Sequence, residues 1–298
     1  MLGSALQSLM KLSVPNGGRV SIVVVENDRS ERSAGVVDSF RTTSPFPITY
    51  VVEPTIGIPF ARNRALAEAI ALGADWIAMM DDDERVPSDW LVTLHDACLK
   101  YDAEVATGPI VQIPEGTPPP WWKPVADSRN VTGEFRRDAY TNNVLFRSRL
   151  VSADGLSLTF DQRFLHGAED IDFFRRAYNK GVRIVSVAEA KVIEDVPAGR
   201  LDMKRHLQRN YMIAASNSFF RVVHDGRAKA TRNRLPSIIR RFLVGLLLVA
   251  AGSVLKPFAR KPGEKTSAKG ASSLAKAIGS FSGLSGKTSN YYDKVDGT

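Results

Sequence analysis

Short, continuous runs of apolar residues recur through the first two thirds of the chain, and they limit its fold more than any other feature. They occupy residues 19–27, 48–54, 76–80 and 103–113. Such runs are typical of strands that are buried on both faces, as in a parallel sheet between layers of helices. The segment 59–72 has helix start and stop signals, Pro59 and Gly73. The alternation of strands and helices predicts an α/β fold with a mostly parallel sheet.

The charged residues divide the chain into two regions of opposite sign. The net charge of the 298 residues is +8, yet residues 200–298 hold 19 Lys and Arg against 5 Asp and Glu, a balance of +14. Residues 1–199 hold the other 21 basic and 27 acidic residues, a balance of −6. We therefore predict an α/β domain over 1–199 and a basic, helical region over 200–298.

The basic region also contains the longest apolar run of the chain. Residues 242–255 are 14 uncharged residues between Arg241 and Lys256. A basic region can bind nucleic acid or anionic lipid, and the apolar run favours a membrane surface with no nucleic-acid partner. A membrane span needs about 20 apolar residues, so the run predicts a helix that lies in the membrane interface. A buried core helix of a globular domain is the alternative.

The cysteine content and the N-terminal residues agree with an intracellular protein. Cys98 is the single cysteine, so an internal disulfide and a cysteine-based zinc site are both excluded. Residues 1–18 contain no basic leader followed by an apolar core, so we expect no secretory signal. The glycine and serine motifs of common NTPases, dehydrogenases and hydrolases do not occur either.

Three carboxylates follow the apolar run 76–80. Asp81, Asp82 and Asp83 stand side by side, where mutual repulsion makes each harder to ionise. Mg²⁺ or Mn²⁺ would relieve that repulsion, since both ions prefer oxygen ligands and accept few protein carboxylates when phosphates complete their shell. The triplet predicts a divalent-cation site, and a solvated acidic turn is the alternative.

A second acidic group stands at the start of a predicted helix. Glu169 and Asp170 precede the apolar residues of this helix, and Asp172 follows on another face. Carboxylates are favoured at helix N-termini, so simple helix stabilisation would explain them. A general base that takes a proton from an acceptor hydroxyl is the functional alternative. His166 lies beside this pair and is a candidate substrate contact.

Further polar residues lie at positions suited to a nucleotide. Arg62 offers a planar fork to a base or a phosphate, although a surface arginine on a helix would look the same. Glu26 and Asn27 follow the first strand run and offer acceptors to a ribose or a base. Ligands bind at the carboxyl ends of strands in such sheets, which is where we expect these residues to lie.

These motifs, taken in order, resemble the family 2 glycosyltransferases. The residues that carry the resemblance read VVVEND, EPTIGIPFARNRAL, GADWIAMMDDDERVPSDWL, TNNVLF and GAEDIDFFRRA. They cover about residues 2–200 and look most like the exopolysaccharide branch of the family, the ExoM-like glucosyltransferases. The resemblance implies a GT-A fold, a nucleotide-sugar donor, Mn²⁺ or Mg²⁺ as cofactor, and inversion at the anomeric carbon.

The resemblance also implies a role for each candidate residue. Asp81 and Asp82 would face the nucleotide and its ribose, and Asp83, together with Asp81, would bind the metal. Asp170 would deprotonate the acceptor hydroxyl with support from Glu169. The residues that would line the nucleotide pocket are Arg62, Glu26 and Asn27.

The sequence departs from the family at its start and beside the predicted base. The family opens with a strand before its first helix, whereas this sequence opens at that helix, so we expect a GT-A fold that lacks its first strand. Gly167 and Ala168 replace the usual pair of glycines. The leading hypothesis is an inverting bacterial enzyme at the cytoplasmic face of the inner membrane, which moves glucose from UDP-glucose to a lipid-linked oligosaccharide in exopolysaccharide synthesis. The first alternative is a catalytically impaired GT-A-like scaffold in a polysaccharide-assembly complex, and a second is a metal-dependent phosphohydrolase.

Overall fold

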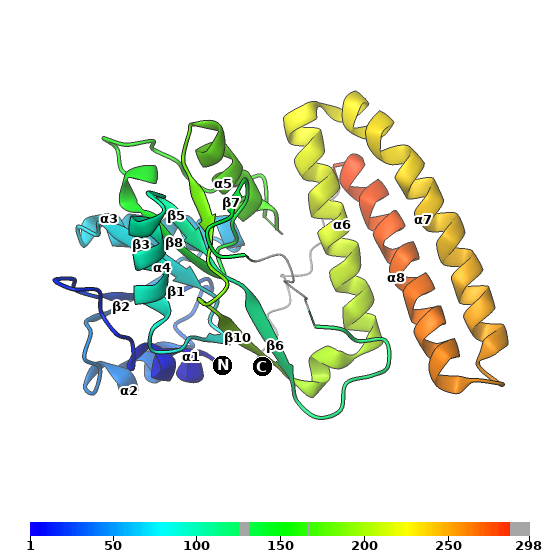
Figure 1. Ribbon diagram of the computed structural model, residues 1–298, viewed down its shortest axis with the longest axis horizontal. Coiled ribbons are helices and arrows are strands. Elements are labelled where there is room, and N and C mark those ends of the chain that lie inside the picture. The colour runs from blue at the N-terminus through cyan, green and yellow to red at the C-terminus, as the bar shows by residue number, and fades with distance from the viewer. Residues whose placement is uncertain (125–130, 166, 287–298) are drawn as a thin grey trace. The chain divides into compact units, whose positions relative to one another are not determined.

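The computed structural model describes residues 1–124, 131–165 and 167–286 (Figure 1). The chain forms two compact units. Unit 1 comprises residues 1–113, 124–163 and 169–195, and unit 2 comprises residues 114–123, 164–168 and 196–298. Nearly all strand residues belong to unit 1, whereas three long helices make up most of unit 2.

Short helices and strands alternate through unit 1. The helices are α1 (Leu2–Leu9), α2 (Ala34–Arg41), α3 (Ile58–Ala71), α4 (Trp90–Lys100) and α5 (Glu169–Asn179). The first strands are β1 (Ile22–Glu26), β2 (Ile48–Val52), β3 (Trp76–Met80), β4 (Glu84–Arg85) and β5 (Val105–Thr107). The later strands are β6 (Ile110–Pro114), β7 (Phe135–Arg136), β8 (Asn143–Arg147), β9 (Ile184–Ser186) and β10 (Val192–Val196). The predicted strand at 76–80 is confirmed, and the helix expected over 59–72 is α3.

A five-stranded sheet forms the centre of unit 1, in the order β3-β8-β5-β9-β7. β8 runs antiparallel to both of its neighbours, β3 and β5. β5 and β9 are parallel, and β7 is antiparallel to β9. The sheet is therefore mixed, and the expected mostly parallel sheet is not what the structure shows. An apolar run reports that a strand is buried on both faces, as β8 is, but it does not report the direction of the strand.

Helices cover both faces of this sheet. Phe146 packs with Phe174 of α5 on one face. Leu145, the preceding residue of the same strand, packs with Leu94 of α4 on the other face. Successive side chains of a strand point to opposite faces, so a strand between two helical layers needs apolar residues at every position. This packing explains the continuous apolar runs of the sequence.

Two smaller sheets complete unit 1. β1 and β2 pair in parallel, and Ile22 packs there with Leu6 of α1 and Val37 of α2. The other sheet has the order β4-β10-β6, with β4 antiparallel to β10. The expected loss of a first strand is not confirmed by this arrangement, and it stays a prediction.

Unit 2 is built from α6 (Met203–Asp225), α7 (Arg227–Leu255) and α8 (Arg260–Leu284). Asp202 caps α6, because its carboxylate accepts a hydrogen bond from the backbone N–H of Lys204 at 2.9 Å. α8 lies between α6 and α7 in Figure 1 and packs along both helices. Helical structure was expected in this region, whereas the boundary at residue 199 stays a prediction.

The helices of unit 2 approach one another closely at glycines. A Cβ atom on Gly270 of α8 would lie 2.7 Å from the carbonyl oxygen of Gly245 in α7. A Cβ atom on Gly279 would lie 2.1 Å from the carbonyl oxygen of Tyr211 in α6. Side chains of any size would force the three backbones apart at these points. Small residues therefore fix the packing of α8 against both neighbours.

α7 is longer than the apolar run that predicted it. The helix has 29 residues, because it continues from the run back through Arg241 and Pro236 to Arg227. By length and composition alone it could cross a membrane, and most of its apolar stretch is exposed. Leu247 and Val254 are 70% and 71% exposed. The alternative of a buried core helix therefore does not fit this structure.

Candidate functional site

The acidic triplet Asp81–Asp83 lies directly after β3 and leads into β4. Glu84, the first residue of β4, is only 2% exposed, and its Oε2 accepts a hydrogen bond from the backbone N–H of Asp81 at 3.0 Å. Arg85 fixes β4 to β10, since its guanidinium donates two hydrogen bonds to Asp195, each at 2.7 Å. The turn that carries the triplet is thus held at both of its ends.

The predicted general base lies in the first turn of α5. Glu169 is 2% exposed, whereas Asp170 is half-buried and accepts a hydrogen bond from the backbone N–H of Ile171 at 2.7 Å. Ala168, just before the helix, has a φ of 75° in the left-handed region that favours glycine. The side chain in place of the usual glycine therefore adds backbone strain beside the candidate base.

Arg62 of α3 joins the two acidic groups. Its Nη1 forms an ion pair with Glu169, and its Nη2 lies 3.7 Å from Oδ1 of Asp81. Only 16% of its side chain is exposed, and the guanidinium lies 5.8 Å from the centroid of the Phe160 ring. The fold thus brings two distant acidic segments of the sequence, Asp81 and Glu169, to one arginine. Arg62, which resembled a surface arginine in the sequence, is largely buried.

The electrostatics of the group favour a bound cation. The pKa of Asp81 is raised to about 6. Loss of water is the main cause, the charges of Asp83, Asp82 and Asp170 add to it, and the charge of Arg62 opposes it. The Asp81 side chain is nevertheless 48% exposed, so solvent and ligands reach it. A divalent cation would favour the charged forms of these carboxyls and relieve their repulsion.

Burial acts in the same direction on Glu169 and Asp170, the first two residues of α5. Desolvation raises the pKa of Glu169 to about 7, Arg62 opposes that shift, and Asp170 adds to it. Desolvation also raises the pKa of Asp170, again against Arg62. A carboxylate whose pKa is raised toward neutrality is a stronger base than an ordinary aspartate, which is what proton abstraction from a hydroxyl requires.

The residues present fit a metal that is shared with a ligand. Within the described residues, no three His, Cys, Asp or Glu side chains converge as a complete metal site. Mg²⁺ and Mn²⁺ do not need one, because one or two carboxylates and the oxygens of a diphosphate suffice. Asp81 supplies an exposed carboxylate within a group of like charges, so the donor set suits such a shared ion.

The hydrogen bonds of Glu26 and Asn27 are made with other residues than those of this acidic group. Glu26 accepts hydrogen bonds from the hydroxyl of Tyr50 and from the backbone N–H of Ser33. The Asn27 amide donates to the carbonyl oxygen of Thr55 at 2.7 Å and accepts from the N–H of Gly57 at 2.8 Å. Asn27 therefore shapes the turn that leads into α3. The nucleotide contacts expected of both residues stay predictions.

Two residues without an assigned role also help to build the site. Glu84 is a buried acid whose pKa desolvation raises to about 9, and the charge of Asp81 adds to this shift. Asn143 is 1% exposed and accepts a hydrogen bond from Nε1 of Trp90 at 2.9 Å. Asn143 begins the apolar strand β8 and pairs there with Met80, the last residue of β3, so a polar residue at the end of an apolar run was the available signal. Glu84 had the weaker signal of an acid directly after the triplet. Asp172, by contrast, pairs with Arg176 at 2.7 Å as a structural residue would, and His166 lies outside the described residues.

Solved structures share this fold. The structure of S. aureus TarS 1-349 in complex with UDP aligns with 99% of this chain and 90% of its own, at 17% identity and a TM-score of 0.51. The complex of the same protein with UDP-GlcNAc aligns with 98% of this chain and 89% of its own, at 14% identity and the same TM-score of 0.51. The chain therefore has a GT-A-like glycosyltransferase fold.

Sequence comparison identifies the family. The model described as Glycosyl transferase family 2 matches residues 1–161. The succinoglycan biosynthesis protein ExoM of Rhizobium meliloti (strain 1021) is 32% identical over 217 residues, which are 70% of this chain and 68% of that protein. The galactofuranosyltransferase GlfT1 of Mycolicibacterium smegmatis is 25% identical over 178 residues, 54% of this chain and 56% of its own length. The chain is a glycosyltransferase, and it belongs to glycosyl transferase family 2.

Proposed function

We propose that this chain transfers a sugar from a nucleotide-sugar to an acceptor hydroxyl with inversion at the anomeric carbon. The single observation that carries the proposal is the convergence of Asp81, Glu169 and Asp170 around Arg62. One end of this group has an exposed carboxylate suited to a diphosphate-bound cation, and the other has a half-buried carboxylate suited to a base. A metal-dependent inverting transfer needs these two functions in one place.

Asp170 takes the proton of the acceptor hydroxyl in this proposal. The acceptor oxygen attacks the anomeric carbon from the face opposite the nucleoside diphosphate, a C–O bond forms as the bond to the diphosphate breaks, and the proton moves to Asp170. Glu169 is ion-paired with Arg62, so it is not the residue that takes the proton. Glu169 therefore acts by positioning Arg62.

The triplet holds the cofactor in this proposal. Asp83 and Asp81 bind Mn²⁺ or Mg²⁺, while Asp82, Glu26, Asn27 and Arg62 contact the nucleotide. When bound, the ion supplies positive charge that stabilises the departing diphosphate.

The acceptor and its location follow from the relatives and from unit 2. ExoM is named for succinoglycan biosynthesis, so we infer a saccharide acceptor in exopolysaccharide synthesis, with UDP-glucose as the donor. The exposed apolar residues of α7, with basic residues at both ends, favour a lipid-linked acceptor and a membrane surface on the cytoplasmic side.

A donor panel tests the proposal. Purified full-length protein is given UDP-glucose, UDP-galactose or UDP-GlcNAc with Mn²⁺, Mg²⁺ or a chelator, and release of nucleoside diphosphate is measured. We expect release with UDP-glucose that requires the metal and is lost in Asp170→Asn but kept in the control Asp38→Asn, a carboxylate on α2 that is 60% exposed. Donor binding without any release would favour the scaffold instead.

A further inference from the structure

The three helices of unit 2 carry far more positive than negative charge. α6, α7 and α8 together contain 15 Lys and Arg but only two acidic residues, Asp225 and Glu264. Both acids are already paired, Asp225 with Lys229 at 3.4 Å and Glu264 with Arg260 at 3.0 Å. Within the part of the chain that the structure describes, these helices have no further acidic residue to balance the remaining cations.

Arg234 of α7 is a partly buried member of this set of cations. Its Nε is buried and has no hydrogen-bond partner among the described residues. Desolvation lowers the pKa of Arg234, and the nearby charges of Arg221 and Arg241 lower it further. An arginine stays protonated in proteins, so it does not escape this environment by losing its proton.

Lys276 of α8 extends the same group. Desolvation lowers its pKa, and the charge of Arg241 adds to this effect. Ser273, one turn earlier on α8, donates a hydrogen bond to the carbonyl oxygen of Arg241 at 2.9 Å, so the two helices are in contact here. The cations thus come from all three helices: Arg221 from α6, Arg234 and Arg241 from α7, and Lys276 from α8.

The packing of the helices keeps these cations together. Gly245 of α7 meets Leu274 of α8, where a Cβ atom would lie 2.8 Å from the leucine side chain. Gly283 of α8 meets α6, where a Cβ atom would lie 2.1 Å from the carbonyl oxygen of Ala215. Helices in such close contact cannot separate to reduce the repulsion of their charges. Arg221 is exposed, but Arg234, Arg241 and Lys276 are partly buried. Partly buried cations without a counter-charge are costly, and a bound anion would remove that cost.

We propose that Arg221, Arg234, Arg241 and Lys276 form a binding site for the phosphate group of a membrane lipid. Guanidinium groups donate paired hydrogen bonds to phosphate oxygens, and an ammonium adds a point charge.

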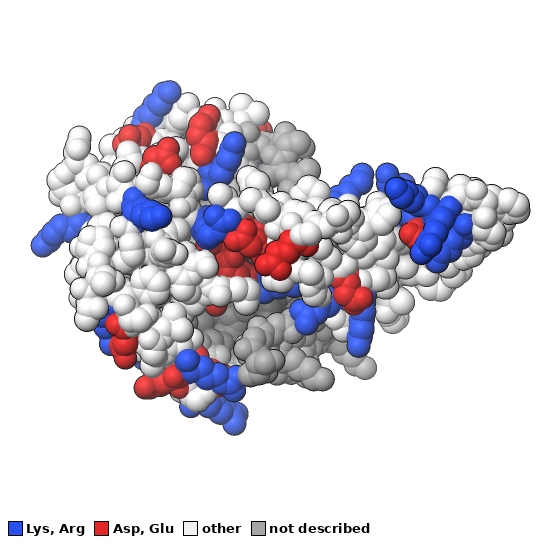
Figure 2. All heavy atoms as spheres, turned by 90° about the horizontal axis from the view of Figure 1, so that it is seen from below, with Lys and Arg blue, Asp and Glu red and all other residues white. Residues whose placement is uncertain are grey.

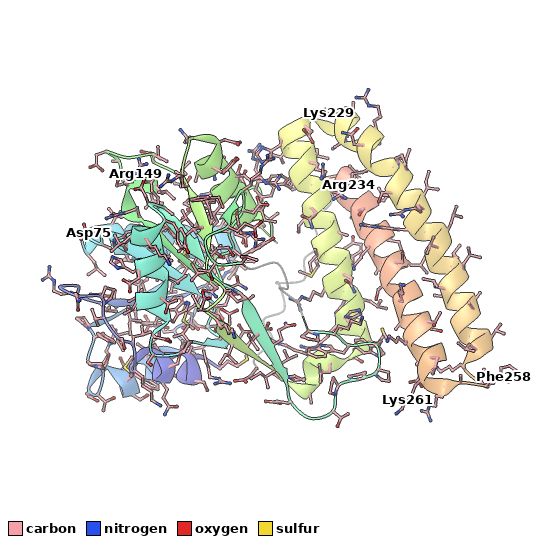
Figure 3. The ribbon with its side chains drawn as sticks, viewed as in Figure 1. Asp75, Arg149, Lys229, Arg234, Phe258 and Lys261 are labelled. Atoms are coloured by element: carbon pink, nitrogen blue, oxygen red, sulfur yellow. The ribbon has the colours of Figure 1, made fainter. Side chains whose placement is uncertain are left out.

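The exposed side of α7 argues for a lipid rather than a free phosphate. Leu243, Leu247 and Val254 are 55%, 70% and 71% exposed, and Phe258, beyond the end of the helix, is 86% exposed. Arg234 lies near one end of the α7–α8 hairpin and Phe258 at the other, so the apolar side chains run along the helix from the cation group to the tip (Figure 3). Lys and Arg side chains also gather at that tip (Figure 2). Acyl chains would cover the apolar residues while the phosphate meets the cations.

Vesicle binding by the full-length protein tests the site. Co-sedimentation is compared for phosphatidylcholine vesicles with and without phosphatidylglycerol, using Arg234→Gln/Arg241→Gln and the charge-matched control Lys265→Gln/Lys269→Gln, two exposed residues of α8. General attraction to an anionic surface predicts an equal loss in both variants, about fivefold for each charge. We expect the site variant to lose at least about tenfold more binding than the control. Equal losses would overturn the proposal.

Thermal unfolding separates a lipid from free phosphate and guards against a folding defect. Without anions, Arg234→Gln should unfold at the same or a higher temperature than the unchanged protein, because an uncompensated cation is removed. Short-chain phosphatidylglycerol should raise the unfolding temperature of the unchanged protein more than inorganic phosphate at equal ionic strength. A larger rise with inorganic phosphate would overturn the lipid assignment.

The inference rests on the proposed function only in its choice of a lipid as the source of the phosphate. Release of nucleoside diphosphate from UDP-glucose, measured without lipid, should be unchanged in Arg234→Gln/Arg241→Gln, since neither residue belongs to the acidic group of unit 1. Loss of lipid binding with normal release would support the site, whereas absence of release in the unchanged protein would count against the proposed function alone.

Discussion

Both units of this glycosyltransferase contain a group of like charges, but only the group in unit 1 includes a residue of opposite charge. In unit 1, the carboxylates that follow β3 and begin α5 lie around one largely buried arginine, and Asp81 stays 48% exposed. In unit 2, the cations of three helices surround a buried Arg234 Nε that has no partner among the described residues. A group with an internal counter-charge can stay folded while it awaits a cation. In our proposals a group without one takes its counter-charge from a bound anion, so the first group serves catalysis and the second serves attachment.

The largest effect is expected at the metal ligand. Asp83→Ala removes a carboxylate from the ion that stabilises the departing diphosphate, so donor turnover and its dependence on metal should both be abolished. The measurement is nucleoside diphosphate release across a Mn²⁺ titration, with Asp38→Asn as control. Near-normal turnover by Asp83→Ala at low Mn²⁺ would refute the metal assignment and leave the triplet as a solvated turn.

Loss of the base should be nearly as severe but different in kind. Asp170→Asn cannot accept the proton, so kcat should fall by about 10²–10⁴, the usual contribution of a general base, while donor affinity is kept. Transfer kinetics and UDP-glucose titration separate the two quantities. If affinity falls and kcat does not, Asp170 is a donor ligand and the two ends of the acidic group have been assigned the wrong way round.

The apolar side of α7 should matter for membranes and not for folding. Leu247→Asp places a charge on a side chain that is 70% exposed, so vesicle binding should weaken by about tenfold or more while the unfolding temperature stays within a few degrees. Thr231→Asp, which adds the same charge on α7 outside the apolar stretch, is the control for charge alone. An unfolded Leu247→Asp would show that this face is covered in the folded protein.

Glu84 should give unit 1 a pH-dependent stability. Its pKa is raised to about 9 in the folded protein from 4.5, so the folded state binds the extra proton between these values. The stabilising contribution of Glu84 is therefore complete below pH 4.5 and is lost as the pH rises through 9. The free energy of unfolding should fall by no more than about 1.4 kcal/mol for each pH unit of this rise. Denaturant unfolding of Glu84→Gln should lack this slope. An unchanged slope would mean that Glu84 is ionised and paired.

The smallest effect is expected next to the base. Ala168 has a φ of 75°, so Ala168→Gly relieves backbone strain in the folded state. The same change increases the conformational entropy of the unfolded chain, so the free energy of unfolding should rise by less than about 1 kcal/mol. Ala67→Gly, at an exposed position within α3, should lower it by about 1 kcal/mol. Denaturant midpoints of the two variants should therefore move in opposite directions. Equal destabilisation would show that the conformation of Ala168 carries no strain.

Much of the local structure was predictable because its signals are local. The run 76–80 became β3, Pro59 and Gly73 bracketed α3, and the acidic pair 169–170 opened α5. The direction of β8 was not predictable, because burial on both faces gives the same apolar run in either direction. The length of α7 was underestimated for a related reason, since charged residues such as Arg241 end an apolar run but do not end a helix.

The sequence by itself determined which residues can carry chemistry here: a carboxylate triplet after a strand, an acidic pair at a helix start, and a basic C-terminal region. Only the tertiary structure decided which of them meet. Arg62 pairs with Glu169, 107 residues further along the sequence, and also lies beside Asp81. Asn27 forms hydrogen bonds in the turn before α3, and close helix packing gathers Arg221, Arg234 and Lys276. The physical reason is range: backbone preferences act between near neighbours in sequence, whereas burial and charge act between whatever the fold brings together.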